Sequence, residues 1–487
     1  MNRSNVHLLN LPDEILLIIS KYLNNMDVLY FLFDINNERL NILAQENIFS
    51  NILKFVSIDN ISIIDRFCND ILPRIHHNVK CFAFDAVFME RILLATDYPN
   101  LTELTIFHFQ QEIALNYFTK PSVVLYPYLS LYYPPLSLFN LPSTTFSSPI
   151  LTHLYINVET FADCLYLLDG RLRKLTTLCV IVHHMDTFSE TVHNMDKLLN
   201  LKCFSLKSFY PFQQYDKIIL LLRRMSNLEK LTLNLSIQDR NRVIGGTHVQ
   251  HDILNYMSQL CSFTFYICTY VDLVAVPYKL SSEDIQLTLA NIGQQHISSM
   301  VNYVTGIVNY AFEVRAACSI FSLPFEFDYL RDIGNNFPNI VFSYVTYLLI
   351  EDITPFEHEF FMRIARSFPL LKHLCIWNKK SQELDGLITF SPDNCRLHSI
   401  IEYPHLTILD VKWAHKDYIE QFLNGTKTFV PCLTQFEVSY IDDLKAVTKN
   451  FTREETRRNC AKVEKITAIQ GVIHSKDLCL YFPSLYK

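Results

Sequence analysis

One pattern of apolar positions recurs along most of the chain. It has the form apolar-x-x-apolar-x-apolar, and it is often preceded by Pro or Asn and followed by a polar turn. Because alternate residues of a strand point to the same side, each copy predicts a strand whose apolar side chains face a core. The clearest copies begin at Leu101, Leu151, Leu175, Leu201, Leu228, Leu260, Val345, Leu371, Leu406 and Leu433, and weaker ones begin at Val79 and Val463.

The spacing of these copies is nearly regular. Apart from two steps of 50 and 85 residues, successive copies begin 22 to 35 residues apart. This period resembles that of leucine-rich repeats. The resemblance implies an α/β fold with a curved parallel sheet, in which strand-loop-helix units stack into a solenoid over residues 79–487. Apolar segments such as 218–222 and 360–365 supply the expected helices.

The repeats depart from the regular form at their turns. Regular repeats carry Asn or Cys three residues after the last apolar position, whereas this chain has other residues there, such as Phe109, Glu159 and His183. We therefore expect an irregular solenoid whose turns close in another way. The alternative is a general α/β core in which the pattern recurs by chance.

Two long segments interrupt the pattern. Residues 118–149 are rich in Pro, Tyr, Ser and Leu, which favours an extended loop. Exposed aromatic residues are common interface anchors, so five of its side chains are candidates for a partner surface, with a loop folded back onto the solenoid as the alternative. These side chains are Tyr126, Tyr128, Tyr132, Tyr133 and Phe139. In residues 287–336 the pattern degenerates, and we expect a strand at 323–327 and room for one or two repeats.

The first apolar segment of the chain, residues 11–23, predicts a short helix. Pro12 suits the first helical position, and Asn10 is a candidate cap just before it. Asp13 and Glu14 follow at the positive end of the helix dipole. Apolar residues then cover more than half of the helix circumference, at positions 11, 15, 16, 18, 19, 22 and 23. Such a width needs two covering surfaces.

Two further segments are expected to cover one side of this helix. Residues 27–33 and 38–48 both carry apolar side chains, including Leu40, Leu43 and Ile48. The other side of the first helix then remains for a partner. The alternative is an ordinary amphipathic helix that opens a helical cap.

The same N-terminal segment resembles the F-box, whose signature is Leu-Pro, an acidic residue, Ile-Leu, Tyr-Leu and Asp-Leu. The matching residues are Leu11, Pro12, Glu14, Ile15, Leu16, Tyr22, Leu23, Asp27 and Leu29. The resemblance implies docking to Skp1, the adaptor that links F-box proteins to cullin-based ubiquitin ligases. It implies adaptor contacts from Leu11, Pro12, Ile15, Leu16, Ile19, Tyr22, Leu23 and Leu29, with Glu14 and Asp27 at helix ends. The usual Val-Cys-x-x-Trp of the second half is replaced here by residues 33–40.

This resemblance also sets the expected domain order. We expect a helical F-box domain at residues 1–50 and a helical linker or cap at 51–78, followed by the repeats. An N-terminal docking domain in front of a binding solenoid would attach the repeats to a larger complex.

Composition excludes several classes of protein. With 49% hydrophobic and 19% charged residues, the chain is folded. Nine glycines and no Gly-rich phosphate motif argue against a nucleotide site, and thirteen cysteines without a C-x-x-C indicate reduced, buried thiols. No signal core or long apolar run is present, so we expect a cytoplasmic or nuclear protein without a membrane segment. A net charge of −7 is mild and argues against a general nucleic-acid binder.

Catalytic and metal-binding motifs are also missing from the sequence. His358-Glu359 begins like the zinc motif H-E-x-x-H, but position 362 is Met. The pairs His76-His77 and His183-His184 have no Cys or carboxylate at metal-ligand spacing. We therefore expect no cofactor, no metal and no catalysis.

These observations lead to two hypotheses from different classes. The first is a substrate-recognition subunit of a Skp1-cullin-F-box ubiquitin ligase, which binds Skp1 through its N-terminal helices and a target protein through its repeats. The alternative is a protein-interaction scaffold of leucine-rich-repeat type outside the ubiquitin system, with the N-terminal helices as a solenoid cap. An enzyme would need a group of converging catalytic side chains that the sequence does not reveal.

Overall fold

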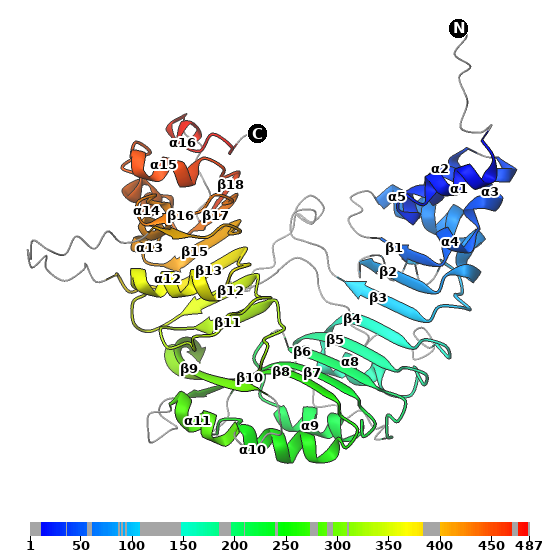
Figure 1. Cartoon of the computed structure of the whole chain (residues 1–487), viewed down its shortest axis with the longest axis horizontal. Coiled ribbons are helices and arrows are strands. Elements are labelled where there is room, and N and C mark those ends of the chain that lie inside the picture. The colour runs from blue at the N-terminus through cyan, green and yellow to red at the C-terminus, as the bar shows by residue number, and fades with distance from the viewer. Residues whose placement is uncertain are drawn as a thin grey trace, which may run out of the picture. The chain divides into compact units, whose positions relative to one another are not determined.

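The computed structural model describes most of the 487-residue chain, namely residues 11–35, 37–55, 61–85, 88, 91–92, 95–107, 148–184, 196–208, 210–238, 242–272, 281–289, 296–308, 311–382, 400–469 and 476–485. Two compact units divide the chain: Met1–Leu235 with Asp252–Phe263, and Ser236–His251 with Thr264–Lys487. Each unit combines helices with parallel strands (Figure 1), so the predicted α/β class is confirmed. Among the described residues, no helix has the length and apolar composition needed to cross a membrane.

The first unit is built on parallel strands that follow one another in chain order. They are β1 (Ile52–Lys54), β2 (Cys81–Asp85), β3 (Glu103–Phe107), β4 (His153–Thr160), β5 (Thr177–His184), β6 (Cys203–Ser208) and β7 (Lys230–Ile237). The middle position of each copy pairs across neighbouring strands, through Leu53, Phe82, Leu104, Leu154, Leu178, Phe204 and Leu231. All seven side chains are buried, so one face of the sheet carries an unbroken apolar row. The strands predicted from Val79 to Leu228 are confirmed.

Each strand from β2 to β7 begins at the same kind of paired backbone hydrogen bonds. The amides of Thr176 and Thr177 both donate to the carbonyl oxygen of Thr152, at 2.8 and 3.0 Å. The hydroxyl of Thr176 adds a third donor to that oxygen at 3.0 Å, and the hydroxyl of Thr152 donates likewise to Thr102 at 3.0 Å. The same two-amide arrangement recurs at the carbonyls of Lys80, Thr102, Thr176, Lys202 and Glu229.

Asparagine side chains join successive turns in front of the strands. Three of them stand directly before the first Leu of a copy and donate to a carbonyl of the preceding turn: Asn100 to His77 at 2.7 Å, Asn200 to Arg173 at 2.8 Å and Asn227 to Leu199 at 3.0 Å. The turns are therefore closed at the strand entrance, in place of the usual position after the strand.

Helices complete the first unit. They are α1 (Asp13–Ser20), α2 (Asn25–Asp34), α3 (Glu38–Ala44), α4 (Asn47–Ser50), α5 (Ile61–Arg66), the π-helix η2 (Phe67–Ile71), α6 (Leu72–Ile75), η3 (His76–Asn78), α8 (Phe161–Leu167), α9 (Tyr215–Arg223) and η7 (Leu254–Tyr256). The segment 51–78 differs from its expected all-helical form because it begins with strand β1. The physical reason is that Leu53 extends the apolar row by pairing with Phe82.

The second unit begins with antiparallel strands. They are β8 (Ser262–Asp272), β9 (Ile297–Val308) and β10 (Ala311–Ser322), and β10 pairs with both others. Strands β9 and β10 therefore form no repeat, and residues 323–327 form no strand, whereas β11 (Tyr329–Ile333), within the same interruption, is a parallel strand of repeat type, so one of the one or two expected repeats is present. Only two residues separate β9 from β10, a connection far too short for the crossover that parallel strands require. Short helices accompany these strands: α10 (Gly246–His248), η6 (Val249–Ile253) and α11 (Ser282–Leu289).

A six-stranded parallel sheet forms the rest of the second unit. Its strands are β11 (Tyr329–Ile333), β12 (Tyr347–Glu351), β13 (His373–Asn378), β15 (Ile408–Ala414), β17 (Gln435–Val438) and β18 (Lys465–Ala468). The helices are α12 (His358–Ser367), α13 (Lys416–Leu423), α14 (Ile441–Val447), α15 (Glu454–Cys460) and α16 (Lys476–Tyr481), and β14 (Ile401–Glu402) pairs with β16 (Thr428–Phe429). The strands predicted from Val345 to Val463 are confirmed.

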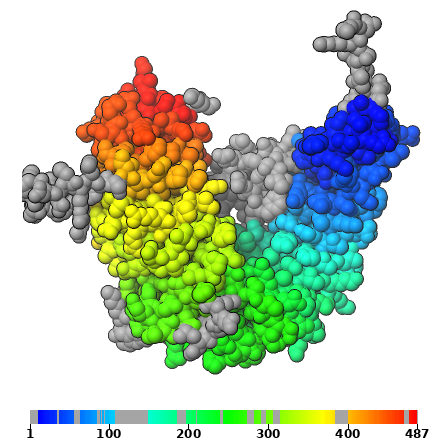
Figure 2. Space-filling model, in the orientation of Figure 1, coloured from blue at the N-terminus to red at the C-terminus, as the bar shows by residue number. Residues whose placement is uncertain are grey.

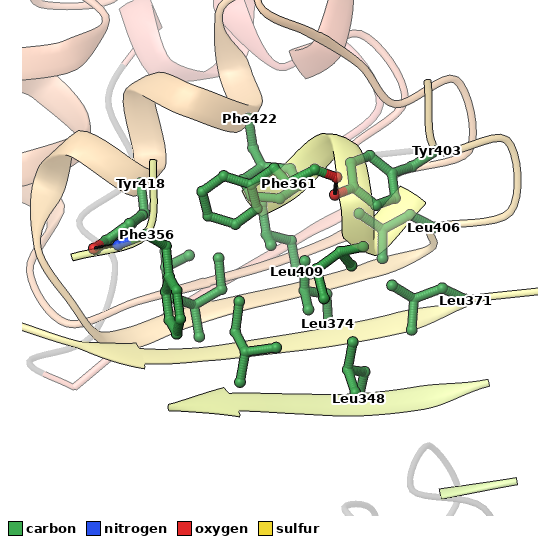
Figure 3. Packing of buried hydrophobic residues seen from close by; sticks show 14 of the residues in the cluster. Leu348, Phe356, Phe361, Leu371, Leu374, Tyr403, Leu406, Leu409, Tyr418 and Phe422 are labelled. Carbon is green, nitrogen blue, oxygen red and sulfur yellow. Dashed lines mark hydrogen bonds between the residues drawn. The ribbon is translucent and has the colours of Figure 1, made fainter. Parts of the chain in front are cut away.

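An apolar row again defines the core side of this sheet. The paired residues are Leu330, Leu348, Leu374, Leu409, Phe436 and Ile466. Helices α12 and α13 bring Phe361 and Phe422 onto this row (Figure 3). The entrance pattern is also the same, since the amides of Thr434 and Gln435 both donate to Thr407 at 2.9 Å.

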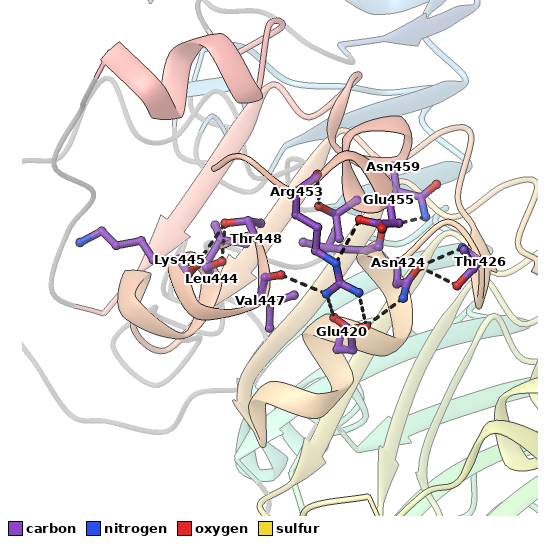
Figure 4. Close-up of polar contacts among 12 residues, drawn as sticks. Glu420, Asn424, Thr426, Leu444, Lys445, Val447, Thr448, Arg453, Glu455 and Asn459 are labelled. Atoms are coloured by element: carbon purple, nitrogen blue, oxygen red, sulfur yellow. Dashed lines mark hydrogen bonds and ion pairs between the residues drawn. The ribbon is translucent and has the colours of Figure 1, made fainter. Parts of the chain in front are cut away.

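A partly buried ion pair ties the last helices together. Arg453 donates to both carboxylate oxygens of Glu420, with its Nη2 at 2.9 Å from Oε1, and Asn424 donates to the same Oε1 at 2.8 Å (Figure 4). Burial alone would raise the pKa of Glu420. The hydrogen bonds from Arg453 and Asn424 outweigh it, and the pKa of Glu420 lies below its usual value.

Removing the threonine hydroxyl at a strand entrance should weaken the sheet. We expect Thr176→Val to lower the free energy of unfolding by about 0.5–1 kcal/mol, because one donor to the Thr152 carbonyl is lost while shape is kept. Thr176→Ser keeps the hydroxyl and should lie closer to the wild type. Urea unfolding curves measure both variants, and equal loss in both would contradict the role of the hydroxyl.

Breaking the Arg453 ion pair should give a pH-dependent loss of stability. We expect Arg453→Met to lower the free energy of unfolding by about 1–2 kcal/mol at pH 7. Because the folded pKa of Glu420 is depressed, the pair contributes stability above the carboxyl's unfolded pKa, and this contribution is lost as the pH falls through the folded pKa. The difference from the wild type should therefore shrink below about pH 4. A pH-independent difference in thermal unfolding would point to lost packing alone.

Candidate protein-docking surface

The first helix, α1, begins where the sequence places it, within one residue. Pro12 is the residue before the helix, and its carbonyl accepts hydrogen bonds from the amides of Ile15 and Leu16, each at 3.1 Å. Asp13 and the exposed Glu14 occupy the first turn, where a negative charge favours the helix dipole. The candidate cap Asn10 lies outside the described residues.

Arg39 of α3 holds the start of α1 in place. Its Nε donates to Oδ1 of Asp13 at 2.6 Å, and its Nη2 donates to the carbonyl of Leu11 at 2.5 Å. Asn37 caps α3 by accepting from the amides of Arg39 and Leu40, at 3.0 and 3.3 Å. The segment in which the sequence departs from the F-box pattern therefore positions α1.

The second helix, α2, starts at a reciprocal pair of hydrogen bonds. The amide of Asp27 donates to Oδ1 of Asn24 at 3.0 Å, and the side-chain amide of Asn24 donates back to Asp27 at 2.6 Å. Asp27 thus stands at a helix end, as the resemblance implies. Its side chain is exposed.

Two of the predicted contact residues face the chain's own core. Leu16 is only 5% exposed and Leu29 is fully buried. Helix α2, which carries Leu29, packs against α3 and α4. Neither side chain therefore belongs to a free surface. The prediction that they contact a partner is corrected: both are part of the protein's own core.

Another side of α1 carries an exposed apolar stripe that continues just past the helix. Ile15, Ile18 and Ile19 of α1 and Tyr22, two residues after its end, are here called the α1 stripe and are 42–87% exposed at helical spacing. The atoms of α1 lie at the surface of the first unit (dark blue in Figure 2). Ile18 is absent from the predicted contacts because the F-box signature does not mark it, although its apolar position three residues after Ile15 was the available signal.

Other predicted residues and further apolar side chains add to this exposure. Pro12 and Leu23 are exposed and Leu11 is partly exposed. Phe31 of α2, Ile42 of α3 and Ile48 of α4 are exposed as well, while Leu43 is buried. Residues 11–50 thus combine a small core with many uncovered apolar groups, which is typical of a protein-interaction site.

Acidic residues outnumber basic ones in this part of the chain. Residues 11–50 contain six acidic and two basic side chains, and one of the two basic ones, Arg39, is engaged with Asp13. A partner for this surface therefore needs an apolar groove with a rim that tolerates or attracts negative charge.

Alternative chemistry finds little support in the described part of the chain. No group of three His, Cys, Asp or Glu side chains there has the geometry of a metal site. Burial raises the pKa of Cys164 and of Cys268 to about 12, so neither thiol is suited to nucleophilic attack near neutral pH. The predicted partner residues Tyr126, Tyr128, Tyr132, Tyr133 and Phe139 lie outside the described residues.

Comparison with known protein families and curated sequences identifies no relative of this chain. No protein-family model matches the chain, and no curated protein matches its sequence.

Loss of the Arg39 contacts should loosen α1. We expect Arg39→Met to speed amide hydrogen exchange in residues 13–20 by about fivefold, because one charge-assisted bond and one bond to a carbonyl are removed. Arg91→Met is the matched control, since Arg91 forms an ion pair with Asp65 elsewhere in the same unit. Equal exchange in α1 for both variants would show that Arg39 does not position the helix.

Proposed function

We propose that this protein is a substrate-recognition subunit of a Skp1-cullin-F-box ubiquitin ligase. In this role the N-terminal helices bind a Skp1-like adaptor, the adaptor connects the chain to a cullin, and the repeats bind a target protein. The chain does no chemistry itself. It would promote ubiquitin transfer by holding target lysines near a conjugating enzyme bound elsewhere in the complex.

The observation that carries the proposal is the exposed α1 stripe. Ile15, Ile19 and Tyr22 belong to the contact set implied by the F-box resemblance, and all three are exposed. Large apolar groups at helical spacing are expected to be buried in a complex when the free chain leaves them uncovered. This exposure argues against the scaffold alternative, in which the first helices pack their apolar face wholly onto the repeats.

The parallel strands support the second half of the proposal. Their in-register apolar rows and their repeated entrance bonds fit a solenoid of leucine-rich-repeat type, in which each unit contacts mainly its neighbours. Solenoids of this kind expose one face of the sheet for binding. The proposed role also places the protein in the cytoplasm or nucleus, and the free cysteines of the described residues fit a reducing compartment.

Capture by purified Skp1 tests the proposal. The full-length chain should bind Skp1, and Ile18→Asp should weaken binding at least about tenfold, because a charge would be placed at the centre of the α1 stripe. Leu220→Asp is the matched control, because Leu220 is 50% exposed on α9 and Ile18 is 51% exposed. Isothermal titration calorimetry measures both affinities, and circular dichroism verifies that both variants fold.

Two outcomes would overturn the adaptor role. One is absence of Skp1 binding by the wild-type chain. The other is equal binding by Ile18→Asp and Leu220→Asp, which would place any contact away from α1. In either case the scaffold alternative becomes the better account of the repeats.

A further inference from the structure

The face of the six-stranded sheet opposite the apolar row carries both tryptophans of the chain. Trp377 on β13 and Trp413 on β15 are register partners with ring centroids 6.0 Å apart, and both are partly exposed. The pairing depends on one extra residue in β15: Asp410 pairs with Cys375, whereas Trp413 pairs with Trp377. Such a bulge redirects a side chain, and here it brings Trp413 to the same face as Trp377, whereas regular alternation would point it to the other face.

Aromatic rings continue along the same face. The rings of Tyr329 and Tyr347 lie 4.9 Å apart, and Tyr347 lies 4.4 Å from the ring of His373. His373 and Trp377 share this side of β13 because they are four residues apart. We name this surface, comprising Tyr329, Tyr347, His373, Trp377 and Trp413, the tryptophan face.

A cation already lies over one of these rings. The Nζ of Lys379 is 5.5 Å from the centroid of the Trp413 ring. Tryptophan is the best aromatic partner for a cation, and the planar guanidinium of arginine stacks on it better than an ammonium does. The ring pair is therefore chemically suited to basic side chains.

Two buried ring nitrogens on this face have no hydrogen-bond partner among the described residues. They are Nε1 of Trp413 and Nε2 of His373. Burial lowers the pKa of His373 to about 4 and outweighs the opposing effect of the Glu437 carboxylate, while Lys412 adds a smaller lowering, so this ring is neutral at pH 7. Both nitrogens lie beneath the surface, so a ligand on this face contacts the rings and not these two atoms.

Two carboxyl groups flank the strand that carries Trp377. Glu351 is the register partner of Trp377 on β12, and Asp410 is the register partner of Cys375 on β15. Burial, assisted by the charge of Asp332, raises the pKa of Glu351 to about 8. The hydrogen bond from the Thr305 amide and the charge of Arg331 lower this pKa, but by less. Burial also raises the pKa of Asp410 to about 6, although Lys412, which contacts both Asp410 and Glu437, opposes the shift.

We propose that the tryptophan face binds an extended, arginine-bearing segment of the target protein. The proposal rests on the proposed function, because it gives the chemistry of the target that the repeats would hold. The guanidinium stacks on the Trp377–Trp413 pair beside Glu351 and Asp410.

Binding of a labelled hexa-arginine peptide tests this proposal. Because Trp377 and Trp413 are the only tryptophans of the chain, the intrinsic tryptophan fluorescence should change on binding, and hexa-glutamate should cause no change. Fluorescence anisotropy should show at least about tenfold weaker binding of hexa-arginine by Trp377→Leu/Trp413→Leu. Tyr344→Leu, which changes an exposed aromatic residue before β12, should bind like the wild type.

The pH dependence of binding separates this site from general attraction to a negatively charged protein. A bound cation favours ionised carboxyls, so binding should release protons and become tighter as the pH rises from about 6 to 8. Glu351→Gln should reduce this dependence. The nearby groups Arg331, Asp332, Lys412 and Glu437 remain unchanged in that variant.

Several results would overturn the proposal. They are an unchanged tryptophan signal, equal affinity of the double-leucine variant, or affinity that does not rise with pH. Ile18→Asp should bind hexa-arginine like the wild type, since it lies in the other unit. Failure of Skp1 binding with intact peptide binding would therefore overturn only the adaptor role.

Discussion

One backbone carbonyl at the entrance of each parallel strand sets the register of the next. It accepts two adjacent amides, as Thr152 does from Thr176 and Thr177 and as Thr407 does from Thr434 and Gln435. A slip by one residue would turn every side chain of a strand to the other face. The repeated entrance bonds therefore keep the leucines on the core side, and the packing of the helices depends on this.

The same constraint orders the face that does not enter the core. Register brings the rings of Tyr329, Tyr347 and His373 into a row, although none of them is needed for the apolar core. The extra residue of β15 lies after Leu409, which still pairs with Leu374. The bulge can thus redirect Trp413 without disturbing the core, because the entrance bonds have already set the register.

The sequence predicts this fold best where the period of its apolar residues matches the alternation of inward-facing side chains in a strand. Each strand copy is visible because inward-facing positions alternate, with one residue between them, and that spacing is the same in any sheet. The pattern does not encode strand direction, so it cannot distinguish the antiparallel pair β9–β10 from degenerate repeats. The strand at Leu53 was missed because too few apolar positions mark it. At the docking surface, the F-box signature located α1 but could not separate buried Leu16 from exposed Ile18, because that difference depends on where α2 and α3 pack.

The energetics of the α1 stripe set a lower limit on any docking interface. Full burial of an isoleucine contributes about 1.5–3 kcal/mol, so three isoleucines that are about half exposed offer roughly 2–5 kcal/mol. Association itself costs roughly 4–15 kcal/mol in lost freedom. The three isoleucines alone reach at most the low end of this cost, so the contact must also use Tyr22 and other exposed side chains such as Phe31 and Ile42. Residues 33–40 match the F-box poorly, yet Arg39 within them fixes the start of α1. Their divergence therefore changes how the helix is supported. It leaves the apolar face of the helix uncovered.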